Sequence, residues 1–384
     1  MLKTRKEFLP FGKPHFGSEE IEAVTRVLES GWIGMGPEVQ LFEKELQDYL
    51  QAPFVVTVNS CTSALFLSLL AHGIGPGDEV ICPSLTWCST ANAALYLGAR
   101  PVFCDIDANT LCMTPEFVLA RLTDRTRAVM VVHYGGLTAD IDAIRNVLPD
   151  NVAIIEDAAH AMGAKYANGR MAGSSGNLGC FSFYANKNLS TGEGGAIALF
   201  DENLKDRLQS LRLHALSTDA WRRFSAPDSI LLPVVNELGY KMNYTDLQAC
   251  IGRAQLKRQA DFAALRLQIA KRYVEELSNI IPGISFQTDI LSLNHARHLF
   301  VIVLPTDTMD MSRDALLREM RKRNIGSSVH YVPLHIMPFY QQQNKVVLEN
   351  TEMLYQGILT LPIGPSMTMD DADYVLEHVK DIFN

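Results

Sequence analysis

Short apolar runs alternate with helix-like stretches over residues 54–200, and this alternation restricts the chain to few architectures. The runs lack the apolar–polar alternation of a half-buried strand, so they are typical of strands covered on both faces of a parallel sheet. Residues 62–72 and 86–97 have helical character and separate three of the runs. This order of elements predicts an α/β fold, with a mainly parallel sheet between layers of helices. The predicted strands span residues 54–59, 79–82, 101–104, 128–133, 152–156, 180–184 and 196–200.

Beyond residue 200 the pattern changes to long, charged helices followed by a second α+β unit. A chain of 384 residues is long for one core, so we expect two domains. We place a large domain with an N-terminal arm at residues 1–255 and a smaller α+β domain at residues 256–384. Helices are predicted at 202–216, 245–279, 312–323 and 370–383, and strands near 284–287, 298–304 and 327–331.

Charge and cysteine content exclude several classes of function. The chain has 34 Lys and Arg against 43 Asp and Glu, a net charge of −9, whereas a nucleic-acid-binding protein normally carries a basic face. Its seven cysteines form no C-x-x-C pair, so neither a disulfide framework nor a metal site is expected. The first residues lack the apolar stretch of a signal peptide, and no apolar run has the length of a membrane span. We therefore expect a cytoplasmic protein without nucleic-acid or membrane partners.

Small polar residues lie between the first predicted strand and an apolar helix, in the segment Asn-Ser-Cys-Thr-Ser-Ala-Leu at 59–65. Exposed N–H groups at a helix N-terminus, together with the helix dipole, favour a phosphate. Ser and Thr are also common as simple helix caps, so a structural role is the alternative. Neither a P-loop nor a G-x-G-x-x-G motif follows a strand here, which disfavours a nucleoside triphosphate or a dinucleotide.

Two carboxylates, Glu156 and Asp157, end another predicted strand. Open α/β sheets bind ligands at the carboxyl ends of their strands. A buried acid needs a cationic partner or several hydrogen bonds, and a protonated pyridine nitrogen would supply that partner. A solvated strand end, or a carboxylate that caps the next helix, is the alternative.

The most informative segment is residues 181–195, in which a strand is followed by small polar residues around Lys187 and then by Thr-Gly-Glu-Gly-Gly. A lysine beside a cofactor can form an imine and later move protons, because its pKa falls readily on desolvation. A loop lysine is usually a surface residue, but the glycine-rich sequence after Lys187 argues against that interpretation.

These segments together resemble the DegT/DnrJ/EryC1/StrS family of nucleotide-sugar aminotransferases, which have the fold of aspartate aminotransferase (fold type I). The resemblance extends from Pro10 nearly to the C-terminus. Enzymes that make UDP-4-amino-4-deoxy-arabinose are the most similar, through residues 86–90, 156–161, 214–216 and 219–221. The other matching motifs lie at residues 30–33, 60–62, 83–92, 182–195, 239–246, 330–335 and 361–367.

The resemblance implies pyridoxal 5′-phosphate (PLP) as cofactor and assigns roles around its ring. Lys187 is the expected Schiff-base residue and the catalytic group. Asp157 would keep the pyridine nitrogen protonated, and Trp87 would stack on the ring. His160, which is glutamine in many relatives, would lie near the phenolic oxygen.

The resemblance also implies a phosphate cup and a homodimer with shared active sites. Cys61 and Thr62 would offer backbone amides, and Thr62 and Ser182 their hydroxyls. Asn243 of the second subunit would complete the cup. Many relatives have G-x-N-x-R here, whereas Lys241 and Asn243 occupy the Asn and Arg positions in this chain. Position 61 is often glycine in the family, and the cysteine side chain of this sequence narrows the loop.

The implied reaction is ping-pong transamination from glutamate to a nucleotide-linked keto sugar, in polysaccharide or antibiotic-sugar biosynthesis, with a 4-keto sugar favoured. A diphosphate is best bound by Arg or Lys. Candidate substrate contacts are therefore Lys241 and Arg222, together with Trp32 and His330, although each could equally be a surface or interface residue.

Three alternatives to this interpretation remain, two of which are enzymes of the same fold. A sugar dehydratase has histidine in place of the lysine, so Lys187 argues against it. A non-catalytic PLP-binding regulator needs no Lys–Asp pair and would usually carry a DNA-binding appendage. An amino-acid aminotransferase is expected to have an arginine near the C-terminus for the substrate carboxylate, and no arginine follows Tyr340.

Overall fold

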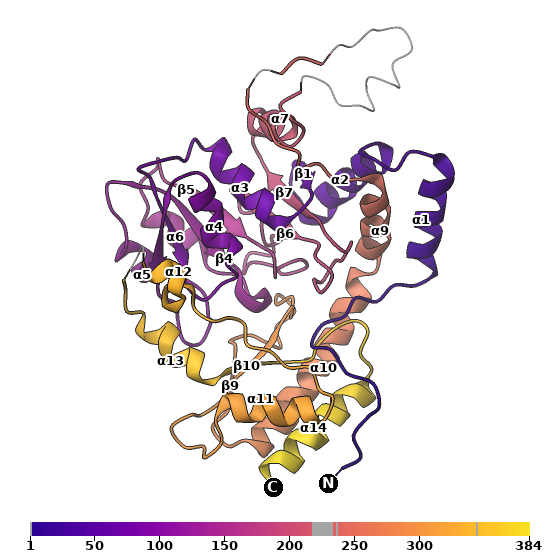
Figure 1. The fold of residues 1–384 in the computed structure, drawn as a ribbon, viewed down its shortest axis with the longest axis vertical. Coiled ribbons are helices and arrows are strands. Elements are labelled where there is room, and N and C mark those ends of the chain that lie inside the picture. Colours follow the sequence, from indigo (N-terminus) through magenta and orange to yellow (C-terminus); the bar gives the residue numbers. More distant parts are fainter. Residues whose placement is uncertain (1, 217–232, 236, 343–344) are drawn as a thin grey trace.

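A seven-stranded sheet forms the centre of the larger lobe in the computed structural model, which describes residues 2–216, 233–235, 237–342 and 345–384 (Figure 1). The strands lie in the order β1-β7-β6-β5-β4-β2-β3. Strand β7 is antiparallel to both neighbours, and the other six are parallel to one another. All seven predicted strands are confirmed, and the mainly parallel sheet with them. The strands are β1 Phe54–Val58, β2 Glu79–Pro83, β3 Arg100–Cys104, β4 Thr126–Val132, β5 Ala153–Asp157, β6 Leu178–Ser182 and β7 Gly195–Leu199.

Helices cover both faces of this sheet. In β1, Val56 packs in the same cluster as Leu65 of α3, whereas Val55 packs in the cluster that contains Phe42 of α2. Because successive strand residues point to opposite faces, the strand is buried on both sides, as its continuous apolar run predicted. The helices of this lobe are α1 Ser18–Ser30, α2 Pro37–Leu50, α3 Cys61–Ala71, α4 Ser89–Tyr96, α5 Pro115–Leu119, η1 Tyr134–Gly136, α6 Ile141–Asn146, α7 Glu202–Leu211 and α9 Asp246–Lys257.

The smaller lobe is built on a three-stranded antiparallel sheet in the order β10-β9-β8. The strand predicted at 327–331 is wrong, since only Ser328 pairs with the sheet, through an isolated bridge to Thr360. Residues His330 and Tyr331 instead leave the sheet and line a cavity. The elements of this lobe are α10 Gln259–Ile280, β8 Ser285–Phe286, β9 Phe300–Val303, α11 Arg313–Lys322, η2 Leu334–Ile336, α12 Pro338–Gln341, α13 Glu349–Gly357, β10 Ile358–Leu361 and α14 Met369–Phe383.

The single helix predicted at 245–279 is divided in two at Arg258. Arg258 ends α9 and precedes α10, and its guanidinium pairs with Glu20 of α1 at 3.0 Å. Helix α9 packs against α1 and α2 of the larger lobe, whereas α10 packs against α14 of the smaller one. A domain division near residue 255 stays a prediction, and it falls in the last turn of α9.

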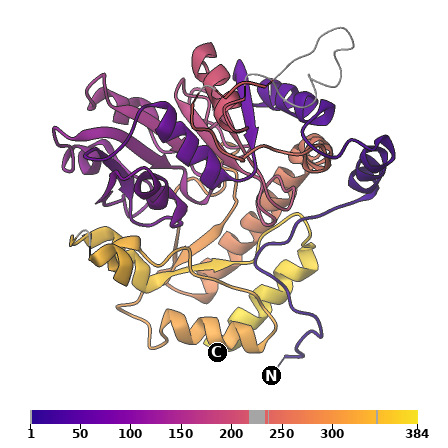
Figure 2. The ribbon, with the colours of Figure 1, turned by 45° about the horizontal axis from the view of Figure 1, so that its top comes forward.

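The N-terminal segment crosses from the larger lobe and runs beside the smaller one (Figure 2). Leu9 forms a bridge with Ile325, and Phe11 accepts a hydrogen bond from the backbone N–H of Ile363 at 3.0 Å. These contacts hold Phe11 at the cavity between the strand ends and the smaller lobe. Within the part of the chain described here, no helix is both long enough and apolar enough to cross a membrane.

Candidate active site

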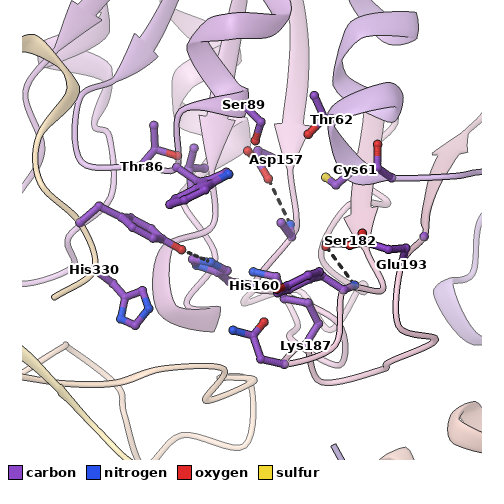
Figure 3. Close-up of a pocket in the computed structure, with 18 of the residues that line it drawn as sticks. Cys61, Thr62, Thr86, Ser89, Asp157, His160, Ser182, Lys187, Glu193 and His330 are labelled. Atoms are coloured by element: carbon purple, nitrogen blue, oxygen red, sulfur yellow. Dashed lines mark hydrogen bonds between the residues drawn. The ribbon is translucent and has the colours of Figure 1, made fainter. Parts of the chain in front are cut away.

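A cavity of about 460 Å³ opens at the carboxyl ends of β5 and β6, where open α/β sheets place their ligands (Figure 3). Eight of the predicted site residues line it, so the structure brings together groups from five separate segments. These eight are Cys61, Thr62, Trp87, Asp157, His160, Ser182, Lys187 and His330.

Lys187 lies in the loop between β6 and β7, where its N–H donates to the carbonyl of Tyr184 at 2.9 Å. Burial of its side-chain ammonium lowers the pKa to about 8. A substantial fraction of the amine is therefore neutral near physiological pH, as a nucleophile requires. Its Nζ lies 3.3 Å from Nε2 of His298.

Asp157, the last residue of β5, is buried and has no ion-pair partner among the described residues. Its Oδ2 accepts a hydrogen bond from the Thr90 hydroxyl at 2.8 Å, and its Oδ1 accepts one from the N–H of Ala159 at 3.2 Å. Burial raises the pKa of this carboxyl above its ordinary value. A buried acid without a cation is costly, so a bound group with a protonated nitrogen would complete this position.

The N-terminus of α3 lies at one end of the cavity. Ser60 caps the helix, and its hydroxyl accepts the N–H of Ser63 at 3.1 Å. The N–H groups of Cys61 and Thr62 lie in the first helical turn, where no intrahelical acceptor exists. A Cβ on Gly195 would lie 2.7 Å from the nitrogen of Cys61. Only glycine therefore allows the first residue of β7 to pack against the first turn of α3. The site thus fits a phosphate bound by backbone amides.

His160 connects the two lobes through Tyr331. Nδ1 of His160 accepts the N–H of Gly135 at 3.3 Å, so the proton of the neutral ring is on Nε2, which donates to the Tyr331 hydroxyl at 2.9 Å. The Tyr331 hydroxyl proton is then available to a bound molecule. Burial and the charge of Lys187 keep the pKa of His160 well below its ordinary value, so the ring is neutral.

Three predicted residues do not reach this cavity within the same chain. Trp32, Lys241 and Asn243 line a second hollow of about 460 Å³, together with Asn59. The amide of Asn243 donates to the carbonyl of Tyr244 at 3.1 Å. Arg222, the remaining candidate, lies outside the described residues.

Sequence reasoning missed several residues of the site. Thr86 and Thr90 lie four positions apart, and their hydroxyl oxygens are 2.8 Å apart. The Thr90 hydroxyl in turn donates a hydrogen bond to Asp157. Helix α4 begins only at Ser89, so Thr86 precedes the helix that carries Thr90, and the contact depends on the turn before α4. No local signal marked His298, which comes from the smaller lobe, or Asn186, whose buried Oδ1 has no partner among the described residues.

One cavity at the edge of a mainly parallel sheet holds a lysine and a buried aspartate beside a helix N-terminus. This arrangement defines a PLP-dependent enzyme of fold type I. The model of the DegT/DnrJ/EryC1/StrS aminotransferase family matches residues 14–380. The chain belongs to this family, and it is a PLP-dependent aminotransferase.

Individual relatives are similar to this chain over nearly its whole length. The spore coat polysaccharide biosynthesis protein SpsC of Bacillus subtilis is 46% identical, over 100% of this chain and 99% of SpsC. The structure of the aminotransferase TlmJ from Streptoalloteichus hindustanus is 32% identical, with a TM-score of 0.88 over 97% of this chain and 98% of TlmJ. Spr1654 of Streptococcus pneumoniae, solved in a pyridoxamine-phosphate form, is 29% identical, with a TM-score of 0.87 over 98% of each chain.

Proposed function

We propose that this enzyme moves an amino group from glutamate to a nucleotide-linked keto sugar, with a 4-keto sugar favoured, by a ping-pong mechanism. The observation that carries the proposal is a cavity in which Lys187 and Asp157 lie among uncharged hydrogen-bonding side chains, with Glu193 as a further acid. Among them, the buried Oδ1 of Asn186 is an acceptor without a partner in the described chain, and a sugar hydroxyl would supply the donor. The relationship to SpsC, named for polysaccharide biosynthesis, supports a sugar acceptor. A cytoplasmic location stays a prediction.

PLP, when bound, forms an imine with a primary amine and draws electrons from the adjacent carbon. Lys187 would hold the cofactor through Nζ until the amino donor displaces it, and its free amine would then carry a proton between two carbons. Asp157, held by Thr90 and Ala159, would keep a proton on the ring nitrogen. The N–H groups of Cys61 and Thr62, with the Ser182 hydroxyl, would bind the phosphate.

An amino-acid acceptor is the alternative that the fold permits. It has less support, because the relationship to SpsC, named for polysaccharide biosynthesis, favours a sugar acceptor. A non-catalytic regulator has less support, because the chain belongs to an aminotransferase family and keeps both Lys187 and Asp157.

The acceptor class is tested with purified enzyme, PLP and glutamate. We expect release of 2-oxoglutarate with UDP- or dTDP-linked 4-keto sugars, and mass spectrometry should detect the aminated sugar. The panel includes 3-keto isomers, pyruvate and oxaloacetate. Amination of the two keto acids with no turnover of any keto sugar would replace this proposal by an amino-acid aminotransferase. Asn186→Ala should raise KM for the sugar, because the variant lacks the unpartnered acceptor.

We further propose a homodimer whose subunits share their active sites. Lys187 is the only cationic side chain that lines the described cavity, although a cofactor phosphate alone carries about two negative charges. The hollow with Lys241 and Asn243 lies apart from the chain's own cavity, and it offers a cation and an amide donor. In a twofold dimer, each such surface can reach the site of the other subunit.

Mixing two inactive variants tests the shared site. One chain carries Lys187→Ala, and the other carries Lys241→Ala with Asn243→Ala, which should weaken PLP retention by about 1–3 kcal/mol per lost hydrogen bond. Each mixed dimer would have one site with all native residues, so an equal mixture should recover about a quarter of the wild-type activity. The readout is turnover after subunit exchange, which is verified with differently tagged chains.

Each variant mixed with itself is the control and should stay inactive. Confirmed exchange without any recovered activity would contradict the shared site, as would a fully active monomer in size-exclusion chromatography with light scattering.

A further inference from the structure

The imidazole of His298 lies beside Lys187, although it belongs to the smaller lobe and precedes β9. Its Nε2 is 3.3 Å from Nζ of Lys187, and the residue is 5% exposed. Its ring lies 4.5 Å from the ring of His160. The contact between His298 and Lys187 is therefore formed only when the two lobes are packed together.

The protonation state of the His298 ring follows from the amide of Asn188. The Nδ2 of Asn188 donates to the carbonyls of Ala296 at 2.9 Å and Met162 at 3.3 Å, which fixes the orientation of the amide. Its Oδ1 then faces Nδ1 of His298 at 3.3 Å. Because an amide oxygen only accepts, Nδ1 carries the ring proton, and the lone pair of Nε2 faces Lys187.

Burial and the surrounding groups keep the His298 ring neutral. Burial disfavours the charged form of His298 and is the main reason why its pKa lies well below the ordinary value. The groups around it act in the same direction, and they are Lys187, His160, Arg266 and His330. Lys187 in turn faces the acidic groups of Cys61 and Asp157. A neutral imidazole with Nδ1 protonated can therefore only accept at Nε2.

We propose that His298 is a positioning residue for Lys187, accepting a hydrogen bond from Nζ and holding the free amine where it reacts. The inference rests on the proposed role of Lys187 as the Schiff-base residue, and it does not depend on the identity of the acceptor. A lysine has four rotatable side-chain bonds, and its free amine has two N–H donors and one lone pair, so an unrestrained amine would sample many positions. A displacement of about 1 Å at a reacting atom can cost about 100-fold in rate.

The test compares His298→Phe, which removes the acceptor, with His298→Gln, which retains an acceptor oxygen. The rate at which PLP adds to the apoenzyme is measured against pH, because only the neutral amine reacts. In His298→Phe the apparent pKa of Lys187 should fall below the wild-type value of about 8, since the buried ammonium loses its acceptor. The single-turnover rate with glutamate should fall about 10- to 100-fold. His298→Gln should recover most of both properties.

The matched control is His378→Gln, which removes another buried histidine, in α14, and should leave the apparent pKa of Lys187 unchanged. An unchanged or raised pKa in His298→Phe would overturn the proposal, because a raised value means that the wild-type imidazole is a cation.

Nitrogen NMR of the histidine-labelled apoenzyme gives a second, independent readout, which requires only the wild type and His298→Gln for assignment. The proposal requires Nδ1 of His298 to be protonated and Nε2 to be unprotonated, and the opposite tautomer would refute it. Neither readout involves a sugar, so failure here is distinguishable from failure of the proposed acceptor. Borohydride trapping of PLP on the wild type tests separately whether Lys187 is the Schiff-base residue.

Discussion

Replacing Lys187 by alanine should lower kcat by about 10⁴-fold or more while the protein stays folded, because the variant loses both the imine-forming amine and the proton carrier. Borohydride should trap the cofactor on the wild type and not on the variant, and peptide mapping should place the label on Lys187. The folded state is checked by circular dichroism and by the thermal unfolding midpoint.

Lys165→Ala is the control, since Lys165 lines a separate hollow near α6 and should be dispensable for trapping and turnover. A labelled peptide centred on any other lysine would refute the assignment of Lys187.

Replacing Asp157 by asparagine should lower kcat by about 10²–10³-fold, comparable to the loss of one preorganised electrostatic group in other active sites. The amide has nearly the shape of the carboxyl but carries no negative charge, so it cannot hold a proton on the ring nitrogen. The absorbance of the bound cofactor, titrated against pH, should change in this variant, which separates a charge effect from unfolding.

Thr90→Val removes the hydrogen bond to Oδ2 of Asp157 together with the contact to the Thr86 hydroxyl, and it should cost about 10-fold or less. Asp142→Asn, at an exposed acid outside the cavity, should have no effect. Wild-type kinetics in Asp157→Asn would mean that protonation of the ring nitrogen does not depend on this carboxylate.

Adjacent residues can have opposite environments, as Glu156 and Asp157 show. The sequence marks both as carboxylates at the end of β5. Because strand side chains alternate, Asp157 faces the cavity, whereas Glu156 is fully buried and accepts hydrogen bonds from His133 and Ser175. Burial alone would raise the pKa of Glu156, but these hydrogen bonds lower it, so Glu156 is a buried structural carboxylate.

The sequence by itself determined the seven strands, the mainly parallel sheet and the segments that carry Cys61, Asp157 and Lys187. Each depends on a local pattern, such as a continuous apolar run or a polar turn after a strand, and nearby residues alone determine it. The same local reasoning failed at residues 327–331, where Ser328 alone pairs with the small sheet and His330 and Tyr331 line the cavity instead.

Only the tertiary structure decided which side chains act together. His298 and Lys187 are 111 positions apart, and Tyr331 and His160 are 171 positions apart, yet both pairs are in hydrogen-bond contact. Such pairs form where the smaller lobe packs against the strand ends, and no period or motif within one segment encodes that packing. The orientation of the Asn188 amide, which decides the tautomer of His298, likewise depends on two carbonyls from distant loops.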